Sequence, residues 1–160
     1  MTPIFEIVLV EPEIPWNTGN VARTCIGLGA RLHLVEPLGF SLEDKDMKRA
    51  GLDYWDKLVW KRHPSLEAFL ENLPEGASVF CLSTKGKKTL WELRSQPGSY
   101  FLFGAETRGL PTWLLERYAD RVYRIPMTGD IRSLNLSTAV GIAAYEAARQ
   151  LNAIPLPGQP

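Results

Sequence analysis

The chain has 160 residues, of which 45% are hydrophobic and 22% charged, and its formal net charge is zero. This length predicts one domain that buries about 68–70% of the surface of its unfolded chain. With no run of 18 apolar residues and no signal-type leader, we expect a cytoplasmic protein without a membrane partner.

The first half of the chain alternates apolar segments with amphipathic ones. In chain order the predicted elements are a strand at 5–10, a helix at 18–28, a strand at 31–36, a short basic helix at 41–51, a strand at 58–60 and a helix at 65–73. The first helix is expected to use Asn17 or Thr18 as its N-terminal cap and to end before Gly29, because these residue types are typical of helix ends.

The second half continues the alternation. It is predicted to contain strands at 77–82 and 100–103, a helix opening at Pro111, a strand at 121–125 and a helix at 136–151. Strands interleaved with helices predict an α/β fold with a mostly parallel six-stranded sheet and helices on both faces. We therefore expect one domain over residues 1–160, with a loose tail at 152–160.

Common nucleotide, hydrolase and metal motifs are missing from the sequence. The GxG pattern at 27–29 is followed by leucine where a third glycine belongs, and the glycines at the ends of 104–109 lack the Lys-Ser/Thr of a P-loop. Cys25 and Cys81 stand alone beside two histidines, so neither a metal site nor a disulfide framework is predicted. We interpret Cys25 as a small buried hydrophobic residue rather than a nucleophile.

Three polar loops follow predicted strands. In the first, Asn17, Asn20 and Arg23 recur every three residues at a helix start. This pattern suits an anion-binding site, and it equally suits a capped helix with a solvated arginine. In the second, Gly104 permits close backbone approach while Glu106 and Arg108 add opposite charges; an ordinary turn with an exposed ion pair is the alternative.

The third loop, residues 126–135, leaves a strand and opens the last helix. It carries Asp130, Arg132, Ser133 and Asn135. A single capping residue would satisfy the helix, and this loop offers several plus an arginine. Because ligands of open α/β sheets bind at the carboxyl ends of the strands, we predict that the three loops form a binding site there.

The three loops resemble motifs 1, 2 and 3 of the SPOUT methyltransferases, and in particular their tRNA 2′-O-ribose methyltransferase branch. The segments that carry the likeness are Asn17-Thr-Gly-Asn-x-x-Arg23, Phe103-Gly-Ala-Glu-Thr-Arg-Gly-Leu110, and Arg124-Ile-Pro-Met with Arg132-Ser-Leu-Asn-Leu-Ser137. Further likeness at Glu11-Pro-Glu-Ile-Pro and Arg49-Ala-Gly-Leu-Asp-Tyr54 is to the bacterial group that methylates the wobble ribose, cytidine or uridine 34. Trp16 departs from that pattern, where a smaller residue or proline is expected.

The resemblance implies a deep trefoil knot at the C-terminal end, a homodimer, and S-adenosyl-L-methionine as cofactor. The knot follows from the likeness alone, since knots are rare among folds. The small residues of the last helix suit either a partner helix in the dimer or a close-packed core of the chain itself; they are Ala139, Ala143, Ala144, Ala147 and Ala148.

The resemblance also implies the site residues. The cofactor residues would be Leu82, Thr84, Gly104, Ile125, Met127, Ser133 and Leu134. The catalytic residues would be Arg23, Glu106, Ser133 and Asn135. Because the pKa of arginine is above about 12, we expect Arg23 to hold a phosphate and stabilise a developing alkoxide rather than to act as a base.

With no net charge, contact with a tRNA anticodon stem-loop must come from local patches. The candidate RNA-binding residues are Asn17, Arg23, Lys48, Arg49, Lys85, Arg108 and Arg132. Two alternatives remain open: the same methyl transfer at another tRNA or rRNA site, and a non-catalytic RNA-binding module.

Overall fold

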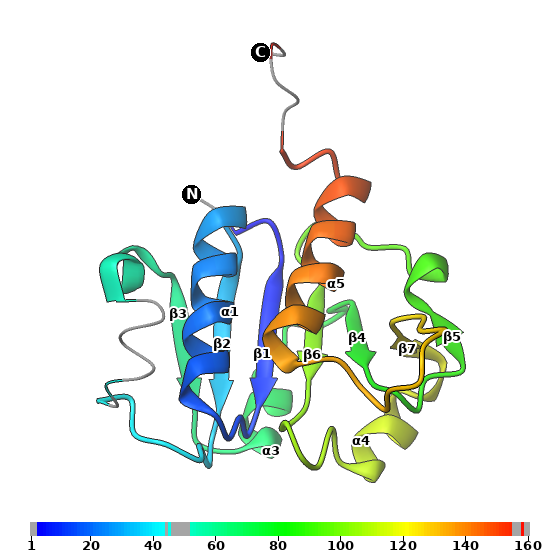
Figure 1. Cartoon of the computed structure of the whole chain (residues 1–160), viewed down its shortest axis with the longest axis horizontal. Coiled ribbons are helices and arrows are strands. Elements are labelled where there is room, and N and C mark those ends of the chain that lie inside the picture. The colour runs from blue at the N-terminus through cyan, green and yellow to red at the C-terminus, as the bar shows by residue number, and fades with distance from the viewer. Residues whose placement is uncertain (1–2, 44, 46–51, 155–157, 159–160) are drawn as a thin grey trace.

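A parallel sheet forms the centre of the structure, a computed structural model that describes residues 3–43, 45, 52–154 and 158 (Figure 1). Within this part of the chain the sheet has seven strands in the order β3-β2-β1-β6-β4-β7-β5, and all of their pairings are parallel. The strands are β1 (Glu6–Val10), β2 (Arg31–Val35), β3 (Trp60–His63), β4 (Val79–Leu82), β5 (Lys88–Thr89), β6 (Tyr100–Phe103) and β7 (Val122–Arg124).

The predicted number of six strands was wrong by one. The missed strand, β5, has only two residues and neither is apolar, so it leaves no periodic signal in the sequence. The strand predicted at 58–60 lies instead at Trp60–His63, an edge strand whose Lys61 and Arg62 are exposed. Edge strands are often polar, which removes the hydrophobic pattern that would locate them.

Helices cover both faces of the sheet. Helices α1 (Pro15–Leu28) and α5 (Leu136–Gln150) lie side by side on one face, whereas α3 (Leu66–Glu71) and α4 (Thr112–Arg117) pack with the other (Figure 1). The 3-10 helices are η1 (Leu52–Lys57), η2 (Leu90–Glu92) and η3 (Ala119–Arg121). None of the helices in the described ranges is long and apolar enough to cross a membrane. The basic helix predicted at 41–51 falls largely outside those ranges.

The central strand β1 shows why its sequence is continuously apolar. Ile7 and Leu9 belong to the core under α1 and α5, whereas Val8 and Val10 belong to the core with α3 and α4. Because successive side chains of a strand point to opposite faces, a strand covered on both faces needs apolar residues at every position. All five residues of β1 are buried, including Glu6.

Helix α1 begins three residues before the predicted start at 18. Pro15 occupies its first turn, and the N-cap residue is Ile14, which has no polar side chain to cap the helix. The prediction of Asn17 or Thr18 as the cap was therefore wrong. The N–H groups of Glu13 and Ile14 instead donate to the carboxylate of Glu106, at 2.7 and 2.9 Å. A cap supplied from about 90 residues away leaves no local sequence signal.

A buried polar cluster lies on the face of the sheet that α3 covers. The Nδ1 atom of His33 lies 2.9 Å from Nε2 of His63, and its Nε2 lies 3.0 Å from a carboxylate oxygen of Glu6. Arg31 approaches the same Glu6 oxygen at 3.3 Å. Phe69 packs edge-on against both imidazole rings. Burial, with smaller contributions from His33 and Lys61, lowers the pKa of His63 to about 4.

This cluster makes stability depend on pH. The folded protein keeps His63 neutral to a lower pH than the unfolded chain does, so stability falls as the pH drops from about 6.5 toward 4. The loss expected from His63 is about 2–3 kcal/mol, measured as the free energy of unfolding by urea at pH 7 and pH 4.5. The variant His63→Gln lacks the titrating group and should show a smaller pH dependence. An identical dependence in both proteins would contradict this role of His63.

Candidate active site

A cavity of about 300 Å³ lies at the carboxyl edge of the sheet. Its walls come from the segments that follow β4, β6 and β7 and from the first turns of α1 and α5. These segments are distant in sequence, and they meet because parallel strands end at one edge. The lining residues are Ile14, Asn17, Leu82, Ser83, Thr84, Phe103, Gly104, Ala105, Glu106, Ile125, Met127, Ser133, Leu134, Asn135, Leu136 and Ala139.

The structure brings the predicted cofactor residues together. All seven of them line this one cavity, and so do three of the four predicted catalytic residues. Two apolar lining residues outside the motif segments, Ile14 and Ala139, were not predicted. Apolar residues next to a motif carry no chemical signal of their own, so only the folded arrangement identifies them.

Gly104 forms a wall of the cavity because the chain doubles back against it. A Cβ atom at this position would lie 2.1 Å from the carbonyl carbon of Gly109 and 2.2 Å from the nitrogen of Leu110. Ala105 and Gly109 form an antiparallel bridge, with the Gly109 N–H donating to the Ala105 oxygen at 2.8 Å. The loop is closed so tightly that only glycine fits at 104.

Gly104→Ala should therefore reshape the cavity. The added Cβ would clash with backbone atoms, which cannot rotate away as the end of a flexible side chain can. The loop itself must therefore move, and we expect the free energy of unfolding to fall by about 1–3 kcal/mol. We expect the affinity for S-adenosylhomocysteine, measured by isothermal titration, to fall at least about tenfold. Gly129→Ala is the matched control, since a Cβ there meets nothing within 4 Å. Equal affinities for both variants would refute the role of Gly104.

A chain of hydrogen bonds joins the three polar loops. The Asn17 amide nitrogen donates to Glu106 Oε2 at 3.0 Å, and the Asn135 amide nitrogen donates to Asn17 Oδ1 at 3.0 Å. The Asn135 oxygen accepts in turn from the N–H groups of Ser137 and Thr138, which caps α5. The capping role considered for Asn135 is thus real, and the same side chain also ties α5 to α1.

The two cysteines take no part in this site. Both are buried, and burial raises the pKa of Cys81 to about 12 and that of Cys25 further. A thiol with such a pKa stays protonated near neutral pH and is a weak nucleophile. The interpretation of Cys25 as a buried hydrophobic residue is confirmed.

Comparison with known proteins assigns the chain to a family. The model of the SpoU rRNA Methylase family matches residues 4–145, which carry the whole cavity. The chain belongs to this family. It is 50% identical to the tRNA (cytidine(34)-2'-O)-methyltransferase of Acidovorax sp. (strain JS42) over 160 aligned residues, covering 98% of each protein.

Solved structures of similar proteins have the same fold. One, described as giving structural insights into the 2-OH methylation of C/U34 on tRNA, is 53% identical, with a TM-score of 0.90 over 94% of this chain and 97% of its own. Another, an AdoMet-bound rRNA methyltransferase from Sinorhizobium meliloti, is 27% identical, with a TM-score of 0.83 over 94% of this chain and 58% of its own.

The cavity suits the cofactor of the SpoU methylases. Its volume lies at the lower end of the range of small-molecule sites. Gly104 has no side chain to cover its main-chain groups, so these groups can bond the polar edge of the adenine ring. Leu82, Ile125 and Leu134 supply apolar surface for the flat base. These residues would hold S-adenosylmethionine.

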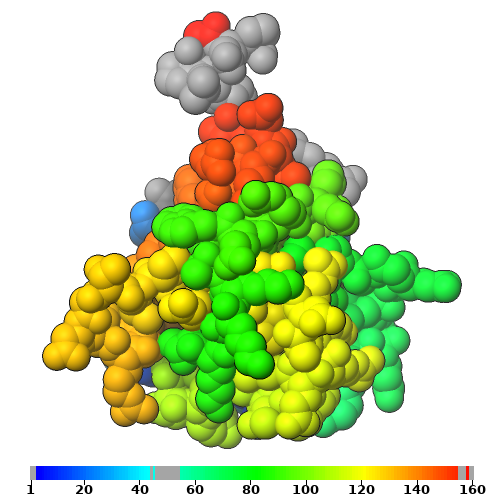
Figure 2. Space-filling view, turned by 90° about the vertical axis from the view of Figure 1, so that its right-hand side faces the viewer, coloured from blue at the N-terminus to red at the C-terminus, as the bar shows by residue number. Residues whose placement is uncertain are grey.

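The cationic residues predicted to contact RNA lie around the cavity rather than in it. Lys85, Arg108 and Arg132 are exposed, and each follows or precedes a lining residue by one or two positions. Arg108 also lies 3.8 Å from the Glu11 carboxylate. In Figure 2 the segment around 126–135, coloured yellow to orange, projects beside the green segment that contains the basic loop, residues 82–88 with Lys85, Lys87 and Lys88. Lys48 and Arg49 lie outside the described residues.

Arg23 does not line the cavity of its own chain. It is exposed on α1, six residues after Asn17, which is about 9 Å along the helix axis. Asn17 itself is only 5% exposed and its amide is used within the chain. The structure thus brings Glu106, Ser133 and Asn135 together and leaves Arg23 on an outer helix face.

Proposed function

We propose that this protein transfers the methyl group of S-adenosylmethionine to the 2′-hydroxyl of the wobble nucleotide of tRNA, a cytidine or uridine at position 34. The observation that carries this proposal is the convergence of all seven predicted cofactor residues on one cavity, next to the Glu106–Asn17–Asn135 chain of hydrogen bonds. The choice of substrate is supported by the relative of 50% identity, which matches over nearly the full length of both chains.

Different residues have different roles in the proposed reaction. S-adenosylmethionine supplies an electrophilic methyl group when bound. Gly104, Ile125 and Met127 hold the adenine edge through main-chain groups, and Glu106, Ser133 and Asn135 orient the reacting groups. Arg23 binds a phosphate of the RNA and stabilises the alkoxide that develops on the ribose. Alignment of donor and acceptor is expected to supply much of the acceleration.

The homodimer forms, in this proposal, through the exposed face of α1 and α5. Trp16, Ile142 and Tyr145 are large hydrophobic residues with 39%, 36% and 52% of their surface exposed. Such residues on one face are typical of interaction surfaces. Arg23 is exposed on α1 as well, and the proposal assigns it to the cavity of the second copy.

The alanines of α5 have a different role from the face just described. Four of the five, at 143, 144, 147 and 148, are at most 2% exposed within the single chain. They belong to the core between α5, α1 and the sheet. Of the two explanations for these small residues, close packing within the chain fits them, which leaves the dimer to the larger exposed side chains.

We include the C-terminal trefoil knot in the proposal. Its support is the tight layering of loops near α5. A Cβ at Gly86 would lie 2.6 Å from the carbonyl carbon of Tyr123, so the basic loop presses on β7. The Gln150 amide, at the end of α5, bonds Ser95 and Leu93 from the segment that follows η2. The end of the last helix is thereby joined to the segment that follows η2.

The deciding experiment is transfer of tritiated methyl from S-adenosylmethionine to total tRNA, followed by nucleoside mapping. The proposal predicts 2′-O-methylcytidine and 2′-O-methyluridine at position 34. Label at another tRNA position, or in rRNA only, would keep the chemistry and change the substrate. No label together with no binding of S-adenosylhomocysteine would refute methyl transfer and favour the non-catalytic RNA-binding alternative.

A further inference from the structure

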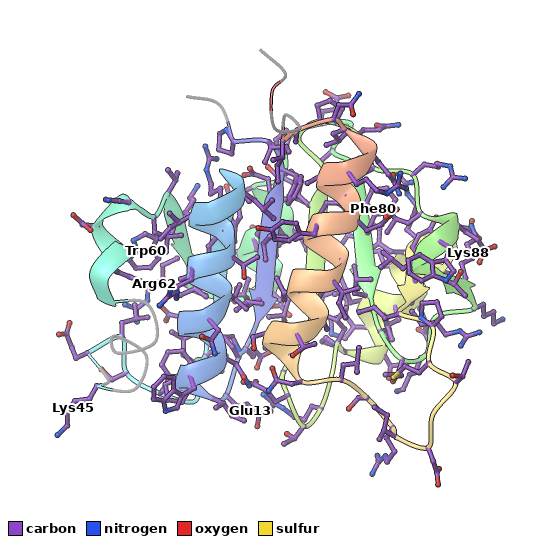
Figure 3. All side chains as sticks on the ribbon, turned by 45° about the horizontal axis from the view of Figure 1, so that its top comes forward. Glu13, Lys45, Trp60, Arg62, Phe80 and Lys88 are labelled. Carbon is purple, nitrogen blue, oxygen red and sulfur yellow. The ribbon has the colours of Figure 1, made fainter. Side chains whose placement is uncertain are left out.

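Two carboxylates cross-link the loop before α1 and the loop after β6. The Glu13 N–H donates to Glu106 Oε1 at 2.7 Å, and the Glu13 carboxylate accepts from the Thr107 N–H at 2.8 Å and from the Thr107 hydroxyl at 2.7 Å. Each loop therefore gives a carboxylate to a backbone N–H of the other. Figure 3 shows Glu13 at the lower end of α1, close to where α5 begins.

Glu13 is also held from its other side. The Gly39 N–H donates to the Pro12 oxygen at 2.9 Å, and a Cβ at Gly39 would lie 2.7 Å from Glu13 Cα. Gly39 thus packs directly against the backbone of Glu13. Hydrogen bonds from Thr107, first the N–H and then the hydroxyl, lower the pKa of the Glu13 carboxyl, so it is ionised near neutral pH.

Neither Glu13 nor Thr107 lines the cavity, but Thr107 adjoins residues that do. Thr107 follows Glu106 directly, and the wall formed by residues 104–106 belongs to the same short loop. The first turn of α1 carries Asn17, the next member of the hydrogen-bond chain that reaches α5. Without the link between Glu13 and Thr107, the 104–106 wall would still be joined to the start of α1 by the Glu106 carboxylate, but it would lose the second anchor that fixes its position.

We propose that Glu13 is a positioning residue for methyl transfer, acting through Thr107 to hold Glu106 and the 104–106 wall against the start of α1. The inference rests on the proposed function, since it concerns the geometry of that reaction. A displacement of reacting groups by about 1 Å can cost about a hundredfold in rate, whereas it changes the binding of a large RNA little. Glu13 should therefore act on kcat more than on KM.

The test compares Glu13→Ala, Thr107→Val and the double variant in methyl transfer to tRNA at 25 °C. We expect Glu13→Ala to lower kcat at least about tenfold, with KM for tRNA within threefold of wild type. Thr107→Val keeps the N–H donor and should lose less. Because the two side chains act as one unit, the double variant should be no slower than Glu13→Ala. Glu13→Gln, which retains an acceptor oxygen, should recover most of the rate.

Glu11→Ala is the matched control, because the Glu11 carboxylate lies 3.8 Å from the exposed Arg108 guanidinium, a long ion pair of small expected energy. It should keep kcat within twofold of wild type. Thermal melts of every variant separate positioning from stability, since a purely structural role lowers the midpoint without lowering kcat of the folded enzyme. Wild-type kcat in Glu13→Ala, or independent effects in the double variant, would overturn the inference. Inactive wild type and control proteins would instead refute the proposed function.

Discussion

Arg23→Ala should lower the rate of methyl transfer about a thousandfold and leave the affinity for S-adenosylhomocysteine within twofold of wild type. The guanidinium is proposed to bind phosphate and the developing alkoxide, and loss of one such donor costs about 10²–10³ in rate. Arg23 lies outside the cavity that would hold the cofactor, so the affinity for that molecule should not change. Tritiated-methyl transfer and isothermal titration measure the two quantities.

Two further variants sharpen this prediction. Arg23→Lys keeps the charge but loses the planar pair of donors, so it should recover only part of the rate. Arg117→Ala removes an exposed arginine from α4, on the other face of the sheet, and should behave as wild type. Loss of cofactor binding in Arg23→Ala would show that Arg23 supports the cavity rather than the reaction.

The proposed homodimer adds a test of where Arg23 acts. If the guanidinium serves the cavity of the second copy, Arg23→Ala mixed with Gly104→Ala should recover activity that neither variant has alone. In such a mixed dimer, one site combines an intact cavity with an intact Arg23 from the other copy. No recovery in a verified mixed dimer would place Arg23 in the site of its own chain.

The fold was predictable to the extent that it depends on local pattern. Fully apolar segments such as Phe80 to Leu82 identify strands covered on both faces, and the loops after them contain the residues that meet in the cavity. The order of the strands was not predictable, because β6 inserts between β1 and β4 through pairings that no local pattern encodes. The two-residue strand β5 was missed for the same reason.

Long-range contacts also explain the errors at the site. The start of α1 depends on Glu106, and the closeness of Gly104 to Gly109 depends on how the loop closes. The buried cluster of His33, His63 and Glu6 joins three strands and has no sequence motif. The sequence motifs identified the polar residues of the site, whereas the hydrogen-bond and packing partners of those residues are apparent only in the folded structure.

Glu106→Ala should give the opposite pattern to Arg23→Ala, because Glu106 holds the cavity together. Its carboxylate accepts from two backbone N–H groups at the start of α1 and from the Asn17 amide. Loss of a helix cap costs about 0.5–2 kcal/mol, and a buried donor left without an acceptor costs about 1–3 kcal/mol. We therefore expect unfolding in urea to show a loss of about 2–3 kcal/mol.

The same change should weaken the binding of S-adenosylhomocysteine and lower methyl transfer about a hundredfold, since Asn17 and Asn135 lose their anchor. Glu106→Gln keeps the shape but presents an NH2 group to at least one donor, so it should lie between Glu106→Ala and wild type in both stability and rate. If Glu106→Ala instead binds the cofactor normally and only methylates slowly, Glu106 touches the reacting groups and does not organise the loops. Cofactor affinity thus separates the residue that shapes the cavity from the residue that serves the reaction.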